Sequence, residues 1–247
     1  MDQGGSASKA IGWGLVVGGI LIAAVVVALY SPTLGLFDVR RLQVIGNETV
    51  PAAQLAEFTG VQAGENLLRI SRARIKTSLL QDPRIQNATV TRSLPHTLVV
   101  HVEERQPVAA CARSAGGWWL LGNDAVIATS VDDLPEGLLI VTGIPWDREA
   151  TPGACATDGW IAFAMALIGD ANAAGAEIQS VDLSDATCVI AARRQGTTIA
   201  LGGPDQLASS VRALKSLLDE VDADDYQSID LSRGGEATLV PREVVNR

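Results

Sequence analysis

The longest apolar stretch of the chain lies near its N-terminus. No Lys, Arg, Asp or Glu occurs between Ala10 and Phe37, and residues 11–30 are nearly all Gly, Ala, Val, Leu and Ile. At about 1.5 Å rise per residue, a helix of this length crosses the roughly 30 Å hydrocarbon core of a bilayer. We therefore expect a membrane helix at 11–30, preceded by a cytoplasmic tail at 1–10 and followed by a linker at 31–36.

The processing and orientation of this segment follow from its flanks. The apolar run exceeds the core of about 7–15 residues in a signal peptide, although Val26 and Ala28 resemble a weak cleavage site, so a secreted, cleaved form stays open. The positive-inside rule compares Lys9 before the segment with Arg40 and Arg41 after it. By charge count alone, the rule would place the C-terminal side in the cytoplasm, but long domains translocate largely regardless of charge. We expect the N-terminus in the cytoplasm and the folded part of the chain outside the cell membrane.

Beyond the linker, the pattern predicts strand, helix, helix, strand, strand. Alternation over residues 39–45 places Leu42 and Val44 on one face of a strand, which Gly46 and Asn47 end. A hairpin follows within residues 84–109, where Ala88 and Val90 and later Leu98, Val100 and Val102 alternate on either side of a Ser93-Leu94-Pro95 turn. Two helices can cover one face of such a three-stranded sheet, so the region is a small α+β unit.

The two helices carry start and stop signals. Thr49 is the candidate N-cap of the first, which ends at Gly60, and Ser71 is the candidate N-cap of the second. The buried sides are expected to hold Ala53, Leu55, Ala56 and Phe58 in the first helix and Ile75, Leu79 and Leu80 in the second. Between the buried positions of the second helix lie Arg72, Arg74 and Lys76. These side chains are expected on the solvated face of the helix, where they could also contact anionic lipid headgroups.

A second α+β domain is predicted further along. Ile199 and Leu201 alternate as a strand, Gly202 and Gly203 form a turn, and Pro204 opens a helix with Leu207, Val211, Leu214, Leu217 and Leu218 at helical spacing. Two last strands, around Ile229 and Leu231 and around Ala237 and Leu239, flank the turn sequence SRGGE.

Composition argues against several functions. The 247 residues carry 19 Lys and Arg against 28 Asp and Glu, a net charge of -9, which disfavours nucleic acid as a partner. His96 and His101 are the only histidines, and neither stands in a metal-ligand spacing. No nucleophile elbow, phosphate loop or zinc-protease motif occurs, so we expect no enzyme, no metal site and no cofactor.

The chain has three cysteines, Cys111, Cys155 and Cys188, and they form no C-x-x-C pair. One disulfide among them is possible, but partly buried thiols are the simpler interpretation.

The segments FDVRRLQVIGNETV (37–50), GENLLRIS (64–71) and DPRIQNATVTRSLPHTLVVHVEERQPVA (82–109) resemble the polypeptide-transport-associated (POTRA) domain. Directly behind one N-terminal membrane helix, this arrangement is similar to the bacterial cell-division family FtsQ, called DivIB in many Gram-positive bacteria. Residues 116–128, 134–143, 197–221 and 228–242 resemble the second domain of that family, although Asn123-Asp124-Ala125 stands where the family often has Asp followed by Gly.

The resemblance implies an α+β chain with a POTRA domain at 37–105, a β-rich domain at 106–242 and a C-terminal tail at 243–247. It implies a non-catalytic scaffold of the division septum that binds FtsB-like and FtsL-like proteins through its last strands. The positions that match this terminal motif are Tyr226, Ile229, Asp230, Leu231, Ser232, Ala237, Thr238 and Leu239. Ile229, Leu231 and Leu239 are equally consistent with core residues of a last hairpin.

Two other functions fit parts of the sequence. A POTRA-bearing envelope assembly or secretion protein would need repeated POTRA units or a barrel of alternating strands about ten residues long. A secreted binding module would need cleavage of the apolar segment, which would give a mature protein without the anchor.

Overall fold

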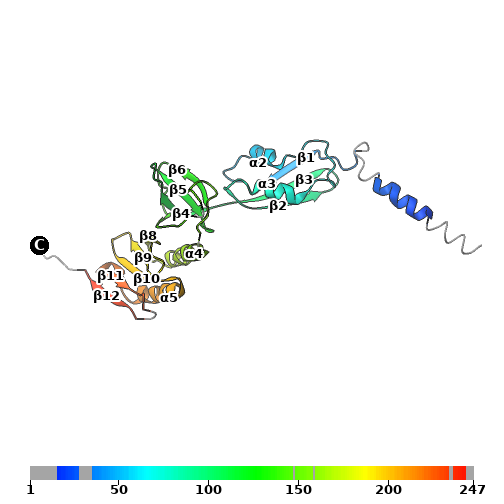
Figure 1. Cartoon of the computed structure of the whole chain (residues 1–247). Coiled ribbons are helices and arrows are strands. Elements are labelled where there is room, and N and C mark those ends of the chain that lie inside the picture. Colours follow the sequence, from blue (N-terminus) through cyan, green and yellow to red (C-terminus); the bar gives the residue numbers. More distant parts are fainter. Residues whose placement is uncertain (1–15, 28–34, 147, 158, 234–235, 243–247) are drawn as a thin grey trace, which may run out of the picture. The chain divides into compact units, whose positions relative to one another are not determined.

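The computed structural model describes residues 16–27, 35–146, 148–157, 159–233 and 236–242. The chain divides into two units, Met1–Glu104 and Arg105–Arg247, and each has its own hydrophobic core. Figure 1 labels most of the helices and strands of both. Together they make a mixed α+β protein with one small and one large β-sheet.

The predicted membrane helix lies only partly within the described residues. Residues 16–27 are helical, and their Val, Ile and Leu side chains are exposed, whereas residues 1–15 and 28–34 lie outside the described part of the chain. Within the described ranges, no helix combines the length and the apolar character needed to cross a membrane. The predicted C-terminal tail at 243–247 also lies outside them.

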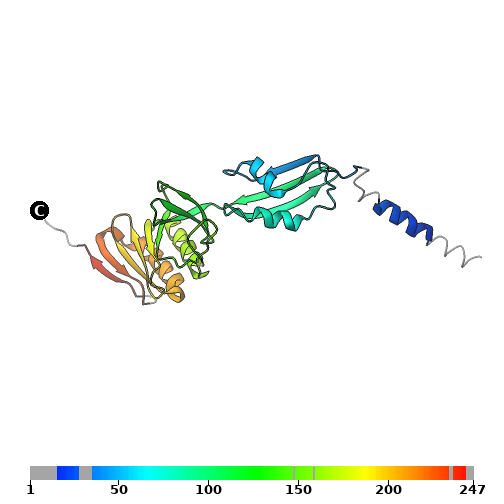
Figure 2. The same cartoon turned by 45° about the horizontal axis from the view of Figure 1, so that its top comes forward.

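The N-terminal unit is a three-stranded sheet with two helices on one face (Figure 2). Its elements are β1 (Arg41–Ile45), α2 (Ala52–Thr59), α3 (Arg72–Leu79), β2 (Ile85–Ser93) and β3 (Thr97–Glu104). The sheet order is β1-β3-β2, with β1 parallel and β2 antiparallel to the central β3. Leu55, Ile75 and Leu79 of the helices are buried in one core with Leu98 and Val100 of β3. The predicted element order is confirmed.

Several local predictions about these helices are confirmed and three are wrong. Ser71 caps α3, because its Oγ accepts the N–H of Arg74 at 3.3 Å, and Gly60 ends α2 in the left-handed conformation at φ 62°. Leu80, however, is 40% exposed and Ala53 is exposed, so neither belongs to the buried side of its helix.

Thr49 is not the N-cap of the first helix; Pro51 holds that position. Thr49 instead binds the carboxylate of Glu104, at the end of β3. One oxygen of Glu104 accepts the N–H groups of Glu48 and Val50 at 2.7 and 3.0 Å, and the other accepts the N–H of Thr49 at 2.9 Å and its hydroxyl. The carboxylate thereby satisfies three consecutive N–H groups of the turn between β1 and α2.

The C-terminal unit is built on a nine-stranded sheet of order β12-β11-β10-β9-β8-β7-β4-β5-β6. The first half holds β4 (Pro107–Ala112), β5 (Trp118–Gly122), β6 (Ile127–Val131), β7 (Leu139–Thr142) and α4 (Gly159–Ala173). The second half holds β8 (Ile178–Asp182), β9 (Val189–Arg193), β10 (Thr198–Gly202), α5 (Pro204–Glu220), a 3-10 turn (Ala223–Asp225), β11 (Tyr226–Asp230) and β12 (Thr238–Pro241). The helix α4 and the strands β8 and β9 were not predicted from the sequence.

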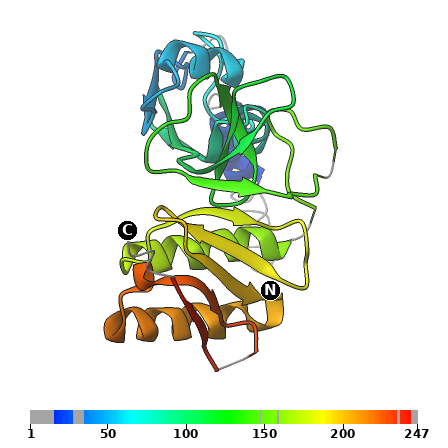
Figure 3. The same cartoon turned by 90° about the vertical axis from the view of Figure 1, so that its left-hand side faces the viewer.

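Both long helices pack on the same side of the β8–β12 part of this sheet, as Figure 3 shows. Pro204 opens α5 after Gly203, as the sequence predicts, and Leu207, Val211 and Leu214 are buried against the sheet. The helix crosses from β10 to the parallel strand β11, and β12 then returns antiparallel to β11. This crossover carries the last two strands to one end of the sheet.

We predict that Glu104→Gln destabilises the N-terminal unit by about 2 kcal/mol at neutral pH, because it removes a charge from four buried or half-buried donors. Burial alone would raise the pKa of Glu104, but the hydrogen bonds from the Thr49 hydroxyl and the three N–H groups lower it overall. Since the folded pKa lies below the unfolded value, the stabilisation is complete above the unfolded pKa and is lost as the pH falls through the folded pKa.

Hydrogen–deuterium exchange of peptides from β1 and α2 measures this effect, since no Trp lies between residues 37 and 104. The matched control is Glu103→Gln, an exposed carboxylate one residue earlier on the same strand. Equal exchange in the two variants at pH 7 would contradict the assigned role of Glu104.

Candidate functional site

The strand β12 forms one end of the large sheet and, among the residues that the structure describes, pairs only with β11. Leu231 donates its N–H toward β10, to the carbonyl of Ala200 at 2.8 Å. Because N–H groups alternate in direction along a strand, Ser228 and Asp230 point toward β12 and pair with Val240 and Thr238. The main-chain N–H and C=O of Leu239, between these two, therefore face the open edge.

The sheet face opposite α4 and α5 carries small side chains next to this edge. One row across five strands consists of Asp182, Ile190, Ala200, Asp230 and Thr238, and a second of Ser180, Ala192, Thr198, Ser228 and Val240. All ten positions are exposed or half-buried. Two aliphatic side chains are prominent there, since Ile190 is 43% and Val240 45% exposed. The edge and this face together form a continuous surface, which we call the terminal surface.

The structure separates the eight predicted partner-binding residues into two groups. Ile229 and Leu231 are 0% and 1% exposed, so they belong to the core, and Leu239 is half-buried against it. Tyr226 is also half-buried and packs on the core. The remaining members, Asp230, Ser232, Ala237 and Thr238, lie at least partly on the surface.

Asp230 and Ser232 shape the turn that leaves β11. One carboxylate oxygen of Asp230 accepts the hydroxyl of Ser232 at 2.6 Å and its N–H at 2.9 Å. These bonds, with the charge of Arg233, lower the pKa of Asp230 below its ordinary value. The turn is thus set by a short local carboxylate contact.

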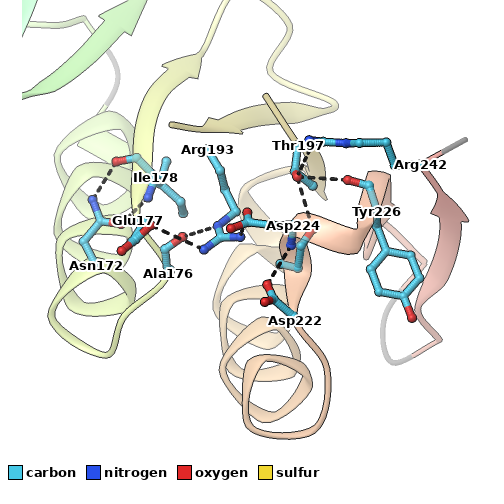
Figure 4. Close-up of polar contacts among 11 residues, drawn as sticks. Asn172, Ala176, Glu177, Ile178, Arg193, Thr197, Asp222, Asp224, Tyr226 and Arg242 are labelled. Carbon is cyan, nitrogen blue, oxygen red and sulfur yellow. Dashed lines mark hydrogen bonds and ion pairs between the residues drawn. The ribbon is translucent and has the colours of Figure 1, made fainter. Parts of the chain in front are cut away.

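A buried arginine supports the other end of β11, as Figure 4 shows. The Arg193 Nε donates to the carbonyl of Ala176 at 2.8 Å, and its guanidinium forms ion pairs with Asp224 and, at 3.7 Å, with Glu177. These contacts join the end of β9 to the turn after α4 and to the 3-10 turn that precedes β11. Sequence reasoning missed Arg193, because its partners are far away along the chain.

Thr197 and Arg242 also hold the last strands at this end, and Figure 4 shows both residues. The buried hydroxyl of Thr197 lies 2.9 Å from the carbonyl oxygen of Tyr226 and 3.1 Å from that of Ala223. Arg242, directly after β12, donates its N–H to Asp225 at 2.8 Å and its guanidinium to Gln195 at 3.1 Å. The start of β11 and the end of β12 are therefore fixed to the β9–β10 connection.

Reactive groups elsewhere in the described chain do not converge on one point. No cluster of three or more His, Cys, Asp or Glu suited to a metal ion occurs among the described residues. His96 Nδ1 lies 3.0 Å from the carbonyl of Asp38, and His101 is exposed. None of the three cysteines forms a disulfide, and burial raises the pKa of Cys111 to about 11.

Comparison with known proteins gives a consistent set of relatives. Residues 37–105 match the family described as POTRA domain, FtsQ-type. The chain is 28% identical over 131 residues to the cell division protein FtsQ of Corynebacterium glutamicum, covering 53% of each chain. It is 29% identical over 72 residues to the cell division protein DivIB of Clostridium acetobutylicum, covering 29% of each chain. It is also 29% identical over 197 residues to the cell division protein FtsQ of Anaeromyxobacter sp., covering 76% of this chain and 65% of that protein. The chain thus spans about half the length of the first of these relatives and under a third of the second.

We predict that Arg193→Met destabilises the C-terminal unit by about 3 kcal/mol, because it leaves the partly buried carboxylate of Asp224 without its cation. Chemical denaturation followed by Trp fluorescence reports this unit, which contains Trp118, Trp119, Trp146 and Trp160. The matched control is Arg194→Met, which changes an exposed neighbour. Equal denaturation midpoints in the two variants would show that Arg193 does not support the fold.

Proposed function

We propose, on the premise that this chain belongs to the FtsQ/DivIB family of bacterial cell-division proteins, that it is a non-catalytic scaffold of the division septum. In this proposal, residues 11–30 anchor the chain in the cell membrane with the N-terminus in the cytoplasm. Both folded units then lie outside the membrane, where the chain binds FtsB-like and FtsL-like division proteins and helps to assemble septal peptidoglycan synthesis.

The observation that carries this proposal is the open edge of β12. An unpaired strand edge is a template on which an extended segment of a partner can add as a further strand. The N–H and C=O of Leu239 supply main-chain hydrogen bonds for such a segment. This mechanism places few demands on side chains, because main-chain groups make the contacts.

The terminal surface also favours a partner that continues beyond the edge. Its small side chains, such as Ala192 and Ala200, allow a close approach of a second element to the sheet, and Ile190 and Val240 supply apolar contacts. A strand that pairs with β12 and a neighbouring segment that lies on the open face would bind together. Binding of the first segment raises the effective concentration of the second segment at the open face, so the two together bind more tightly than either alone.

The anchored ends of the last strands support the same role. Arg193, Thr197 and Arg242 fix β11 and β12 to the rest of the unit. A partner strand therefore meets an edge that is already ordered, so little conformational entropy is lost on binding.

We predict that Leu239→Pro weakens binding of the partner at least about tenfold, because proline removes the outward N–H and its ring obstructs the added strand. The ladder bonds from β12 to β11 come from Thr238 and Val240 and remain. Isothermal titration with the extracytoplasmic segment of an FtsB-like protein measures the affinity. Substitutions at Ile229 or Leu231 cannot test the edge, because both residues are buried.

The matched control is Leu239→Ala, which shortens the half-buried side chain but keeps the main-chain donor. Edge pairing predicts that the alanine variant binds much more tightly than the proline variant. If both lose affinity equally, the side chain and not the strand edge makes the contact, and the edge mechanism is wrong.

The cellular part of the proposal predicts that a fluorescently tagged copy forms a band at midcell in dividing cells. Fluorescence microscopy of the full chain at native expression level tests this. A uniform signal around the envelope would contradict a septal role, and a released, shortened product would indicate the cleaved, secreted form.

A further inference from the structure

The N-terminal unit contains a cavity of about 410 Å³ between the end of α2 and the start of α3. Its inner wall is formed by the buried residues Thr59, Asn66, Ile70 and Ile75, and its rim includes the exposed residues Glu65, Arg69 and Arg74. It lies on the N-terminal unit, whereas β12 and the terminal surface belong to the C-terminal unit.

The polar groups of the inner wall are already engaged with the protein, which gives the cavity a defined shape. The Thr59 hydroxyl donates to the carbonyl of Ala56 at 2.7 Å and accepts the N–H of Val61 at 3.2 Å. The side-chain oxygen of Asn66 accepts the N–H of Leu68 at 2.9 Å. These bonds hold the loop between the two helices in place.

The two rim arginines differ from Arg84 and Arg92 of the same unit in their contacts. Arg84 pairs with Asp82 at 2.6 Å, and Arg92 donates to the carbonyl of Ile70. The guanidinium groups of Arg69 and Arg74, in contrast, make no hydrogen bond or ion pair with any described residue. Both therefore keep their donors for a ligand.

Arg74 lies beside Gly60 and close to the start of its own helix. A Cβ at position 60 would lie 3.8 Å from the Arg74 Nη2, which is an ordinary contact distance, and the φ of 62° at Gly60 favours glycine. The N-terminal end of α3 at Ser71 also lines the cavity, and the positive end of a helix dipole favours an anion. Glu65 is the one acidic residue among the described lining residues, so positive charge predominates.

The charge distribution along the chain favours an acidic ligand at this place. Residues 1–104 carry 9 basic and 8 acidic residues, whereas residues 105–247 carry 10 basic and 20 acidic residues. An acidic segment is therefore repelled by the C-terminal unit and meets less repulsion at the N-terminal unit.

We propose that this cavity is a carboxylate-binding site for an acidic peptide segment, with Arg69 and Arg74 as the two cations that hold the carboxylate. Planar guanidinium groups match carboxylate oxygens in pairs, and Ile70 and Ile75 give the rest of the peptide an apolar wall. The site goes beyond the proposed partner binding at β12. It lies on the N-terminal unit, and it would recognise the negative charge of a ligand and not an extended main chain.

Fluorescence anisotropy with the full chain in a neutral detergent tests the site. The probe is a fluorescein-labelled hexapeptide of Asp, Glu and Gly with a free C-terminus, and its counterpart has Asn, Gln and an amidated C-terminus. We expect the acidic probe to bind and the amide probe to bind at least about tenfold more weakly. Arg69→Gln and Arg74→Gln should each weaken binding of the acidic probe about tenfold.

The matched control is Arg72→Gln, which removes the same charge from an exposed position that does not line the cavity. Binding should stay within about twofold of the unchanged chain. If Arg72→Gln weakens binding as much as the other two, the probe follows diffuse surface charge and the site is wrong. If phosphatidylglycerol vesicles bind through Arg69 and Arg74 while the peptide does not, the peptide occupant is wrong.

The two proposals fail independently of each other. Leu239→Pro leaves the cavity unchanged, so it should bind the acidic hexapeptide like the unchanged chain. Hydrogen–deuterium exchange of α2 and α3 peptides establishes that the arginine variants remain folded. A loss of peptide binding in folded Arg74→Gln, with partner binding at β12 retained, supports the cavity alone.

Discussion

The N-terminal unit depends on one buried carboxylate. Glu104 ends the central strand β3 and satisfies the consecutive N–H groups of Glu48, Thr49 and Val50, which no helix or strand could satisfy in their turn conformation. The turn that it holds sets where β1 ends and where α2 begins, and α2 covers the sheet on which α3 also packs. The partner residues are more than 50 positions apart, so this bond also fixes the two ends of the unit to each other.

The C-terminal unit uses the opposite charge for a related purpose. Arg193 is buried, and its guanidinium binds a carbonyl and two carboxylates from segments that are distant along the chain. In each unit, a charged side chain of low exposure organises loop backbone from distant parts of the chain. Buried charges can mark a catalytic site, but the contacts of these two are with the surrounding loops.

Local signals were sufficient for much of the fold, and distant contacts account for the errors. Ser71, Gly60 and Pro204 mark helix ends through effects that act within a few residues, and the alternation in β2 and β3 shows directly which side is buried. Thr49 also carries a local capping signal, but the carboxylate of Glu104 competes for the same hydroxyl. The helix α4 was missed because its sequence, GWIAFAMALIGDANA, is apolar on nearly every side and gives no helical contrast.

The candidate sites show the same division. The sequence predicts that the last two strands matter, yet only the register shows that Ile229 is core while the main chain of Leu239 faces outward. Arg74 could be predicted as exposed from its position on the helix. Its place beside Gly60 at the rim of a cavity depends on how α2 and α3 pack, which no local pattern contains.

The position of β12 in the chain has a consequence for synthesis in the cell. Every other strand of the large sheet precedes it, and β11 reaches the sheet only after α5 has crossed over. A ribosome therefore releases the strand that offers the open edge after all the strands that support it. A chain that stops earlier still has an edge, but it is that of β11, with a different register and without Leu239. Capture of a partner strand at β12 would then favour copies that contain β12 over copies that end before it.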